Sequence, residues 1–270
     1  MAAESFGQEK ALTERRHMWR LDGRIALITG ASSGLGAGFA RLLAAAGARV
    51  VLGARRLDRV EALAGELEAG GAEALGVELD VSDDQQVAAA FDAAEARFGT
   101  VDTIIANAGA ACGGRSTEVA ASDVRRVIDT NLLGTYLVAR EGAKRLIAGG
   151  SREREHGRIL LIGSITAEQN HTGDAAYAAT KIGVAHLARQ FAREWARQGI
   201  NVNTIEPGWV HTELNDAWFH SGQSRAAIAG LPRQRMQEPE SLHDMVLYLC
   251  SDNSSAVTGA TFTIDDGQCL

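Results

Sequence analysis

From Arg24 onward, short apolar runs alternate with longer stretches in which apolar residues recur with a helical period. The short runs are rich in β-branched residues and predict buried strands at Ile25–Thr29, Val50–Gly53, Val77–Leu79, Thr103–Ala106, Ile159–Ile162, Val202–Ile205 and Thr261–Ile264. The longer stretches predict helices at Gly34–Ala46, Leu57–Ala69, Asp84–Phe98, Asp123–Ala148, Ala175–Arg197 and Ser241–Leu249. Apolar strands interleaved with helices are typical of a parallel sheet covered on both faces. The pattern therefore predicts an α/β fold with a doubly wound, Rossmann-type sheet of about seven parallel strands.

The pattern also predicts where some elements begin and how the chain divides. Ser82, followed by Asp83 and Asp84, predicts a helix start, because a hydroxyl caps free N–H groups and negative charge is favourable there. The charged, glycine-bounded segment 149–157 predicts a solvated loop. No internal repeat is present, so we expect a single domain over residues 21–270, preceded by a flexible extension at residues 1–20.

Composition limits the classes of function. The chain has 270 residues, 46% of them hydrophobic and 23% charged, which is ordinary for a globular protein. Its 27 basic and 34 acidic residues give a net charge of −7, which disfavours a nucleic-acid partner because phosphate binding needs clustered Lys and Arg. Nowhere do about 18 apolar residues follow one another, so we expect no membrane span.

The spacing of cysteine and histidine and the character of the first residues bear on disulfides, cellular location and metal binding. The three cysteines, Cys112, Cys250 and Cys269, form no CxxC pair and are an odd number, which disfavours a disulfide framework. No apolar run of signal-peptide length is found among the first 24 residues, so we expect a cytoplasmic protein. The seven histidines show neither HxxxH nor HExxH spacing, so we expect no metal site.

A glycine-rich turn joins the first predicted strand to the first predicted helix. It runs Gly30-Ala-Ser-Ser-Gly34-Leu-Gly36 and follows Thr29 directly. Glycines suit this place because the backbone turns sharply and approaches a pyrophosphate closely, while the helix start offers free N–H groups to the anion. A tight turn without a ligand is the alternative, but the strand–turn–helix context favours a nucleotide site.

Tyr177 and Lys181 lie four residues apart in a predicted helix, so their side chains share one face. A free tyrosine has a pKa of about 10 and exchanges protons poorly at neutral pH. A nearby ammonium favours the phenolate and lowers that pKa, so the pair suits acid–base chemistry. Ser164 follows a predicted strand, at the edge where open α/β sheets bind ligands, and could bond a substrate oxygen there.

Together these segments resemble the short-chain dehydrogenase/reductase family. Between Leu21 and Gly267, the matching segments are Thr29-Gly30-x-x-x-Gly34-x-Gly36, Asn107-Ala108-Gly109, Asn131, Ser164, Tyr177-x-x-x-Lys181 and Pro207-Gly208. The resemblance implies that Tyr177 is the general acid/base and that Ser164 orients the substrate carbonyl or alcohol. It also implies that Lys181 grips the nicotinamide ribose and that Asn131 holds a water in a proton relay with this lysine. Any one of these side chains could simply be packed, but the ordered set of four favours catalysis.

The residues after the second predicted strand bear on the choice of dinucleotide. An acidic residue at this place bonds the ribose of NAD, whereas arginine accommodates the 2′-phosphate of NADP. Ala54 stands where the acid would be, and Arg55 and Arg56 follow it. Arg55 matches the family position that pairs with the phosphate, so we expect NADP(H) to be favoured over NAD(H). The preference should be moderate, because Ser33 stands where some NADP-preferring members carry a second basic residue.

The resemblance extends to the other cofactor contacts. It implies that the dinucleotide is held by Gly30, Ser32, Ser33, Gly34, Leu35, Gly36, Arg55, Arg56, Asp80, Val81, Asn107, Ala108, Gly109, Tyr177, Lys181, Pro207, Gly208, Val210 and Thr212. Asp80 and Val81 correspond to a pair at the adenine ring, although Asp80 could instead be an acid at a helix start. The segment 207–212 corresponds to one that holds the nicotinamide carboxamide.

The segment after Pro207 is rich in large rings, and the resemblance implies that it forms a mobile lid. We expect a substrate pocket lined by Ala110, Ile165, His171, Trp209, Leu214 and Trp218. Rings at a lid favour an apolar or aromatic ketone, although they could equally anchor the lid to the core. His171, as a loop histidine, could simply be solvated.

These observations predict an NADP-dependent ketoreductase or secondary alcohol dehydrogenase, with a small-molecule ketone or alcohol as substrate. A 3-oxoacyl thioester reductase and a sugar or polyol dehydrogenase are alternatives within the family. A non-catalytic NADP-sensing protein is the alternative from another class, but it would not need to keep all four catalytic residues. The helices predicted over Asp123–Ala148 and Ala175–Arg197 resemble those that pair subunits in this family, so we expect a homodimer or homotetramer.

Overall fold

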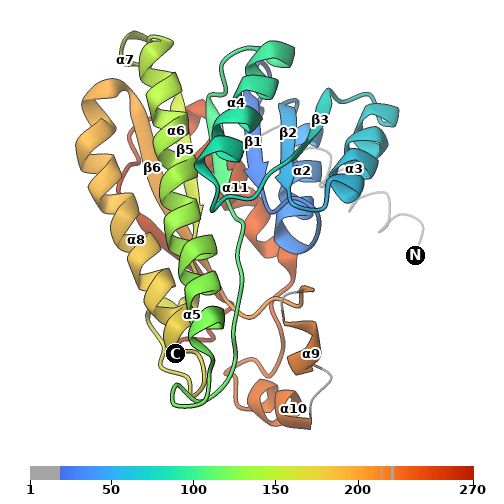
Figure 1. Ribbon diagram of the computed structural model, residues 1–270, viewed down its shortest axis with the longest axis vertical. Coiled ribbons are helices and arrows are strands. Elements are labelled where there is room, and N and C mark those ends of the chain that lie inside the picture. Colours follow the sequence, from blue (N-terminus) through green and yellow to red (C-terminus); the bar gives the residue numbers. More distant parts are fainter. Residues whose placement is uncertain (1–18, 214, 220–221) are drawn as a thin grey trace, which may run out of the picture.

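The computed structural model describes residues 19–213, 215–219 and 222–270, so most of the extension predicted at residues 1–20 lies outside the described part. Its centre is a seven-stranded parallel sheet in the order β3-β2-β1-β4-β5-β6-β7 (Figure 1). The strands are β1 (Ile25–Thr29), β2 (Arg49–Ala54), β3 (Ala74–Glu78), β4 (Thr103–Ala106), β5 (Gly157–Ile162), β6 (Ile200–Pro207) and β7 (Thr261–Ile264). The order reverses between β1 and β4, which confirms the predicted doubly wound fold.

Helices cover both faces of the sheet, because the inner strands are apolar on both sides. One face packs against α4 (Asp84–Phe98), α6 (Gly134–Ala148) and α8 (Ala175–Trp195), and the other against α2 (Gly34–Ala45), α3 (Leu57–Ala69) and α11 (His243–Cys250). The shorter helices are α5 (Ala121–Ile128), α7 (Ser151–Arg154), α9 (Asp216–Phe219) and α10 (Gly222–Ala229), of which the last two lie below the sheet in Figure 1. Among the described helices, none has both the length and the apolarity needed to cross a bilayer.

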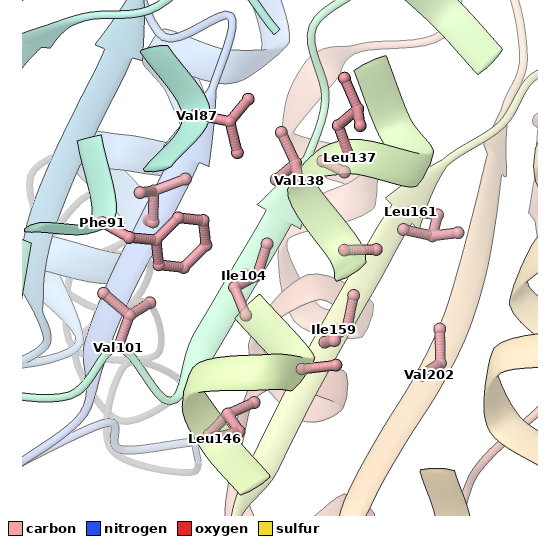
Figure 2. Close-up of a cluster of buried hydrophobic side chains, with 14 of the residues drawn as sticks. Val87, Phe91, Val101, Ile104, Leu137, Val138, Leu146, Ile159, Leu161 and Val202 are labelled. Atoms are coloured by element: carbon pink, nitrogen blue, oxygen red, sulfur yellow. The ribbon is translucent and has the colours of Figure 1, made fainter. Parts of the chain in front are cut away.

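Figure 2 shows the core between the sheet and the helices α4 and α6. Phe91 of α4 and Leu146 of α6 are buried together with Ile104, Ile159 and Val202 of the sheet. Burial of each such side chain contributes about 1.5–3 kcal/mol to folding. This packing fixes the position of α6, and with it the segment that leads into α6 at the edge of the site.

The long helix predicted over Asp123–Ala148 is interrupted in the structure. A π-helical turn at Asp129–Leu133 joins α5 to α6. The turn carries Asn131, whose buried side chain bonds to the backbone of Ala110. A tertiary contact thus stabilises the wider turn, which the helical period of the sequence does not reveal.

Two further local predictions are corrected. The cap of α4 is Asp83 rather than Ser82: the Asp83 carboxylate accepts from the N–H groups of Gln85 and Gln86 at 2.9 and 3.2 Å. The hydroxyl of Ser82 donates instead to Asp80. The segment 149–157, predicted as a loop, contains the single-turn helix α7.

Candidate active site

A cleft with a volume of about 1240 Å³ opens at the carboxyl ends of the strands. Parallel strands all end at this edge, and their connections diverge between β1 and β4, so residues that follow different strands converge there. Residues from the segments after β1, β2, β3, β4, β5 and β6 line the cleft.

The glycine-rich turn forms one wall of the cleft. Where its backbone comes closest to neighbouring atoms, there is no room for a side chain. Gly30 has φ +68°, and a Cβ atom on Gly36 would lie 2.3 Å from the Gly30 carbonyl oxygen and 2.6 Å from Nδ2 of Asn107. Asn107 Nδ2 donates to the carbonyl of Thr29 at 2.9 Å, and Thr29 Oγ1 accepts from the N–H groups of Asn107 and Ala108. The turn is therefore clamped between the ends of β1 and β4.

Helix α2 begins at this turn with its N-terminus in the cleft. Ser33 is the N-cap residue but makes no side-chain cap, and the first N–H groups of a helix have no partner within the helix. Ser32, Ser33, Gly34, Leu35 and Thr212 line the cleft around this end. The close-packed glycines, the free N–H groups and the positive end of the dipole together fit the pyrophosphate of a dinucleotide.

A basic corner lies beside the turn. Arg55 and Arg56 follow β2, line the cleft and are exposed. Arg56 donates to the hydroxyls of Ser32 and Ser33 at 2.8 Å. Burial acts to raise the pKa of Asp80, but hydrogen bonds from Ser82 and the charge of Arg55 outweigh it, so the net shift is downward.

Ser164, Tyr177 and Lys181 meet across the cleft from the turn. Ser164 directly follows the end of β5, and Tyr177 and Lys181 lie one turn apart near the start of α8. Nζ of Lys181 lies 5.5 Å from the centroid of the Tyr177 ring and donates to the carbonyl of Ile162 at 2.8 Å. The structure therefore brings together three of the four residues assigned to catalysis.

Burial shifts both reactive groups toward their neutral forms. It raises the pKa of Tyr177 to about 12, although a hydrogen bond with Ser164 acts in the opposite direction. It also lowers the pKa of Lys181, a residue that is 4% exposed, to about 8. The expectation of a lowered tyrosine pKa is wrong for this structure, because desolvation of the phenolate and the charge of Asp174 outweigh the hydrogen bond with Ser164.

Asn131 lies beneath the cleft rather than in its lining. Its side chain accepts from the N–H of Ala110 at 2.7 Å and donates to the Ala110 carbonyl at 2.9 Å and to Thr180 Oγ1 at 3.1 Å. Thr180 Oγ1 donates in turn to the carbonyl of Tyr177 at 2.7 Å. Asn131 thus ties the segment after β4 to the first turn of α8, which carries the tyrosine.

Gln268 holds the wall formed by the segment after β6. The side chain of Gln268 accepts from the N–H of Trp209 at 2.6 Å, and its carbonyl accepts from Gln169 Nε2 at 2.8 Å. Gln169 also contacts His171, whose ring centroid lies 5.4 Å from that of Trp209. Gln268, which follows β7, therefore joins two walls of the site.

Most residues expected in the site line the cleft. They are Gly30, Ser32, Ser33, Gly34, Leu35, Arg55, Arg56, Asp80, Val81, Asn107, Ala108, Gly109, Ser164, His171, Tyr177, Lys181, Pro207, Gly208, Trp209, Val210 and Thr212. Gly36, Ala110 and Ile165 are buried outside the lining. Leu214 and the side chain of Trp218 lie outside the described part.

The sequence analysis missed three charged residues of the lining: Arg115, Asp174 and Glu213. Asp174 lies just before α8, three residues ahead of Tyr177, and helical spacing alone would have placed it beside the tyrosine. Arg115 and Glu213 enter the site through the folding of long connections, which carry no period. Among the described residues, no three His, Cys, Asp or Glu side chains gather closely enough to hold a metal ion.

Known proteins are similar to this one over most of the chain. Residues 30–268 match the family described as enoyl-(acyl carrier protein) reductase. The chain is 37% identical to cis-4-hydroxycyclohexanecarboxylate dehydrogenase of Sinomonas cyclohexanicum, over 90% of this chain and 96% of that protein. It is 34% identical to D-threitol dehydrogenase of Mycolicibacterium smegmatis, over 93% of this chain and 95% of that protein. The chain belongs to the short-chain dehydrogenase/reductase family.

A solved structure agrees with this assignment. A gluconate 5-dehydrogenase of Burkholderia cenocepacia, in complex with NADP and tartrate, matches with a TM-score of 0.88 and 35% identity, over 94% of this chain and 98% of that one. As a short-chain dehydrogenase/reductase, the chain is an oxidoreductase that acts on alcohol or carbonyl groups.

The contact at Gly36 gives a first prediction. Gly36→Ala should lower the free energy of unfolding by about 1–3 kcal/mol and weaken dinucleotide binding, because its Cβ cannot fit against Gly30 and Asn107. The matched control is Gly38→Ala on the same helix, where a Cβ meets nothing within 4 Å and helix propensity favours alanine. Urea denaturation and fluorescence titration with dinucleotide measure both effects. Equal stability and affinity for the two variants would contradict the close packing.

Burial of Lys181 gives a second prediction. Its pKa is about 8 in the folded protein against 10.5 as the ordinary value, so between these pH values the unfolded chain binds more protons. The unfolding free energy should therefore rise with pH in this window, by at most about 1.4 kcal/mol per pH unit, relative to Lys181→Met. Lys144→Met, at an exposed lysine, is the control and should show no such difference. If the difference in unfolding free energy between the wild type and Lys181→Met stays constant from pH 8 to 10.5, the burial of the Lys181 charge is refuted.

Proposed function

We propose that the chain is an NADP(H)-dependent ketoreductase or secondary alcohol dehydrogenase in which Tyr177 is the general acid/base. The observation that carries the proposal is the meeting of Ser164, Tyr177 and Lys181 at one cleft with the glycine-rich turn and the basic corner. A structural role alone does not account for a half-buried tyrosine that lines a large cleft together with a serine and a lysine.

Ser164, Tyr177 and Lys181 have different roles in the proposed reaction. When bound, the nicotinamide dinucleotide supplies or accepts the hydride at the substrate carbon. Ser164 donates a hydrogen bond to the substrate oxygen and orients it. Tyr177, with a pKa of about 12, is protonated at neutral pH, which is the form that gives a proton to this oxygen during reduction. Lys181 holds positive charge beside the tyrosine, and the resemblance assigns it to the nicotinamide ribose as well.

Two observations support NADP(H) over NAD(H). The last residue of β2 is Ala54 rather than an acid, and Arg55 and Arg56, which follow it, are exposed at the cleft, where they suit a phosphate. The Burkholderia cenocepacia gluconate 5-dehydrogenase, with 35% identity, was determined with NADP. Asn131 would contribute to the site by positioning α8 and, as the resemblance implies, through a water relay with Lys181.

The substrate is a small alcohol or ketone, and the polar lining narrows its class. Arg115, His171 and Asp174 line the cleft, and no ion pair of Arg115 is found among the described residues. These groups favour a substrate with carboxylate or hydroxyl groups over a purely apolar ketone. Hydroxy acids and polyols, like those in the names of the two relatives above, fit this lining, and a 3-oxoacyl thioester stays an alternative.

A homodimer or homotetramer is supported by an apolar face. Five large side chains are 40–53% exposed on the helices that flank one side of the sheet: Ile128, Leu133, Tyr136, Ile147 and Ile182. They extend over α5, the π turn, α6 and α8, the segments that the resemblance assigns to subunit pairing. The cytoplasmic location and the absence of a nucleic-acid partner stay predictions from the sequence.

The catalytic role of Tyr177 is tested by Tyr177→Phe. Turnover should fall by about 10²–10⁴-fold, because the proton donor is lost, while the Kd for NADPH changes by less than about twofold. Tyr248→Phe, on α11 beside Trp19, is the control and should keep the wild-type rate. The assay follows NADPH absorbance over ketones graded by size and charge. A Phe variant with a near-wild-type rate would refute the assignment, and tight NADPH binding without turnover of any ketone would favour the sensing protein.

The cofactor preference is tested by comparing kcat/KM for NADPH and NADH. The wild type should prefer NADPH, and Arg55→Ala should lower kcat/KM for NADPH by about tenfold with little change for NADH, because a charge-assisted contact to the 2′-phosphate is lost. Arg152→Ala on α7, away from the cleft, is the control. A tenfold preference of the wild type for NADH would overturn the proposal.

A further inference from the structure

Glu213 links the segment after β6 to the basic corner of the cleft. Its carboxylate accepts from Nη1 of Arg56 at 2.9 Å and from Nη1 of Arg59 at 2.7 Å. Both arginines lie in the segment after β2, more than 150 positions earlier in the chain. The carboxylate therefore sits where positive charge is concentrated, at the mouth of the cleft.

The hydrogen bonds of Arg56 leave little room for another anion. Nε donates to Ser32 at 3.1 Å, Nη2 to Ser32 and Ser33 at 2.8 Å each, and Nη1 to Glu213. A guanidinium has five N–H donors, and these contacts use four of them. A phosphate that is to be held by Arg56 through two N–H donors must therefore replace at least one of these acceptors.

Glu213 is the acceptor that can be replaced at lowest cost. Its side chain is 54% exposed, and those of Arg56 and Arg59 are 42% and 46% exposed, so water solvates each group if the pairs open. The arginines hold the pKa of Glu213 at about 2, so the carboxylate stays charged at neutral pH. Asp80, the other acid at this corner, is already held by Ser82.

We propose that Glu213 is a specificity-determining residue that competes with the 2′-phosphate of NADP(H) for Arg56. Its negative charge weakens binding of the phosphorylated dinucleotide and leaves the unphosphorylated one unaffected, so it limits the preference for NADP(H). The inference rests on the proposed function, in which Arg55 and Arg56 receive this phosphate. Glu213 thereby adds to the effect expected from Ser33 in keeping the preference moderate.

The test uses Glu213→Gln and two fragments of the cofactor. Isothermal titration calorimetry should show that the variant binds 2′,5′-ADP about three- to tenfold more tightly than the wild type does, as expected for the loss of exposed like-charge repulsion. Binding of 5′-AMP should change by less than about twofold. Glu61→Gln, which removes the same charge from an exposed position of α3, is the control and should leave both affinities as they are.

The possible results separate this inference from the proposed cofactor. Weaker binding of 2′,5′-ADP to Glu213→Gln would mean that Glu213 positions Arg56 for the phosphate, and competition would be wrong. An unchanged affinity for both fragments, or an equal change for both, would also overturn it. If the wild type does not distinguish the fragments but Glu213→Gln does, the NADP preference fails while the competition stands. If neither protein distinguishes them, both proposals fail.

Discussion

Hydrogen bonds between Thr29 and Asn107 hold the carboxyl ends of β1 and β4 together at the point where the connections of the sheet diverge. The glycine-rich turn lies against the same asparagine, at a distance that excludes even a methyl group on Gly36. This part of the cleft is closely packed, because its contacts are made by backbone atoms and by the short side chains of Thr29 and Asn107. The other walls of the cleft come from the longer segments after β4, β5 and β6.

Burial favours the neutral forms of both Tyr177 and Lys181. Desolvation keeps the proton on the oxygen of Tyr177 and weakens the hold of Lys181 on its own proton. The lysine is stabilised by the carbonyl of Ile162, to which Nζ donates. The tyrosine therefore carries its proton at neutral pH, and its conversion to a phenolate depends on further positive charge or hydrogen bonds at its oxygen.

The parts of the protein that sequence could predict are those governed by local spacing. Residues that lie close together in the sequence are enough to predict the strands, the helices, the turn at Gly30 and the pairing of Tyr177 with Lys181. The π turn at Asn131 could not be predicted, because the contact with Ala110 that stabilises it joins two separate segments. The direction of the Tyr177 pKa shift was also missed, because spacing reveals a neighbouring charge but not the loss of water around the hydroxyl. Glu213 was missed because its partners, like the partner of Asn131, lie in a separate segment of the chain, here the one after β2.

The contacts of Gln268 have a consequence for how the protein is made. Gln268 is 5% exposed, its side chain accepts from the backbone N–H of Trp209, and its carbonyl accepts from Gln169. During translation, the strands from β1 to β6 leave the ribosome before Gln268 does, so the hydrogen bonds that join these two walls form after those strands have been made. The cleft of each newly made molecule is therefore completed later than the strands at whose ends it opens.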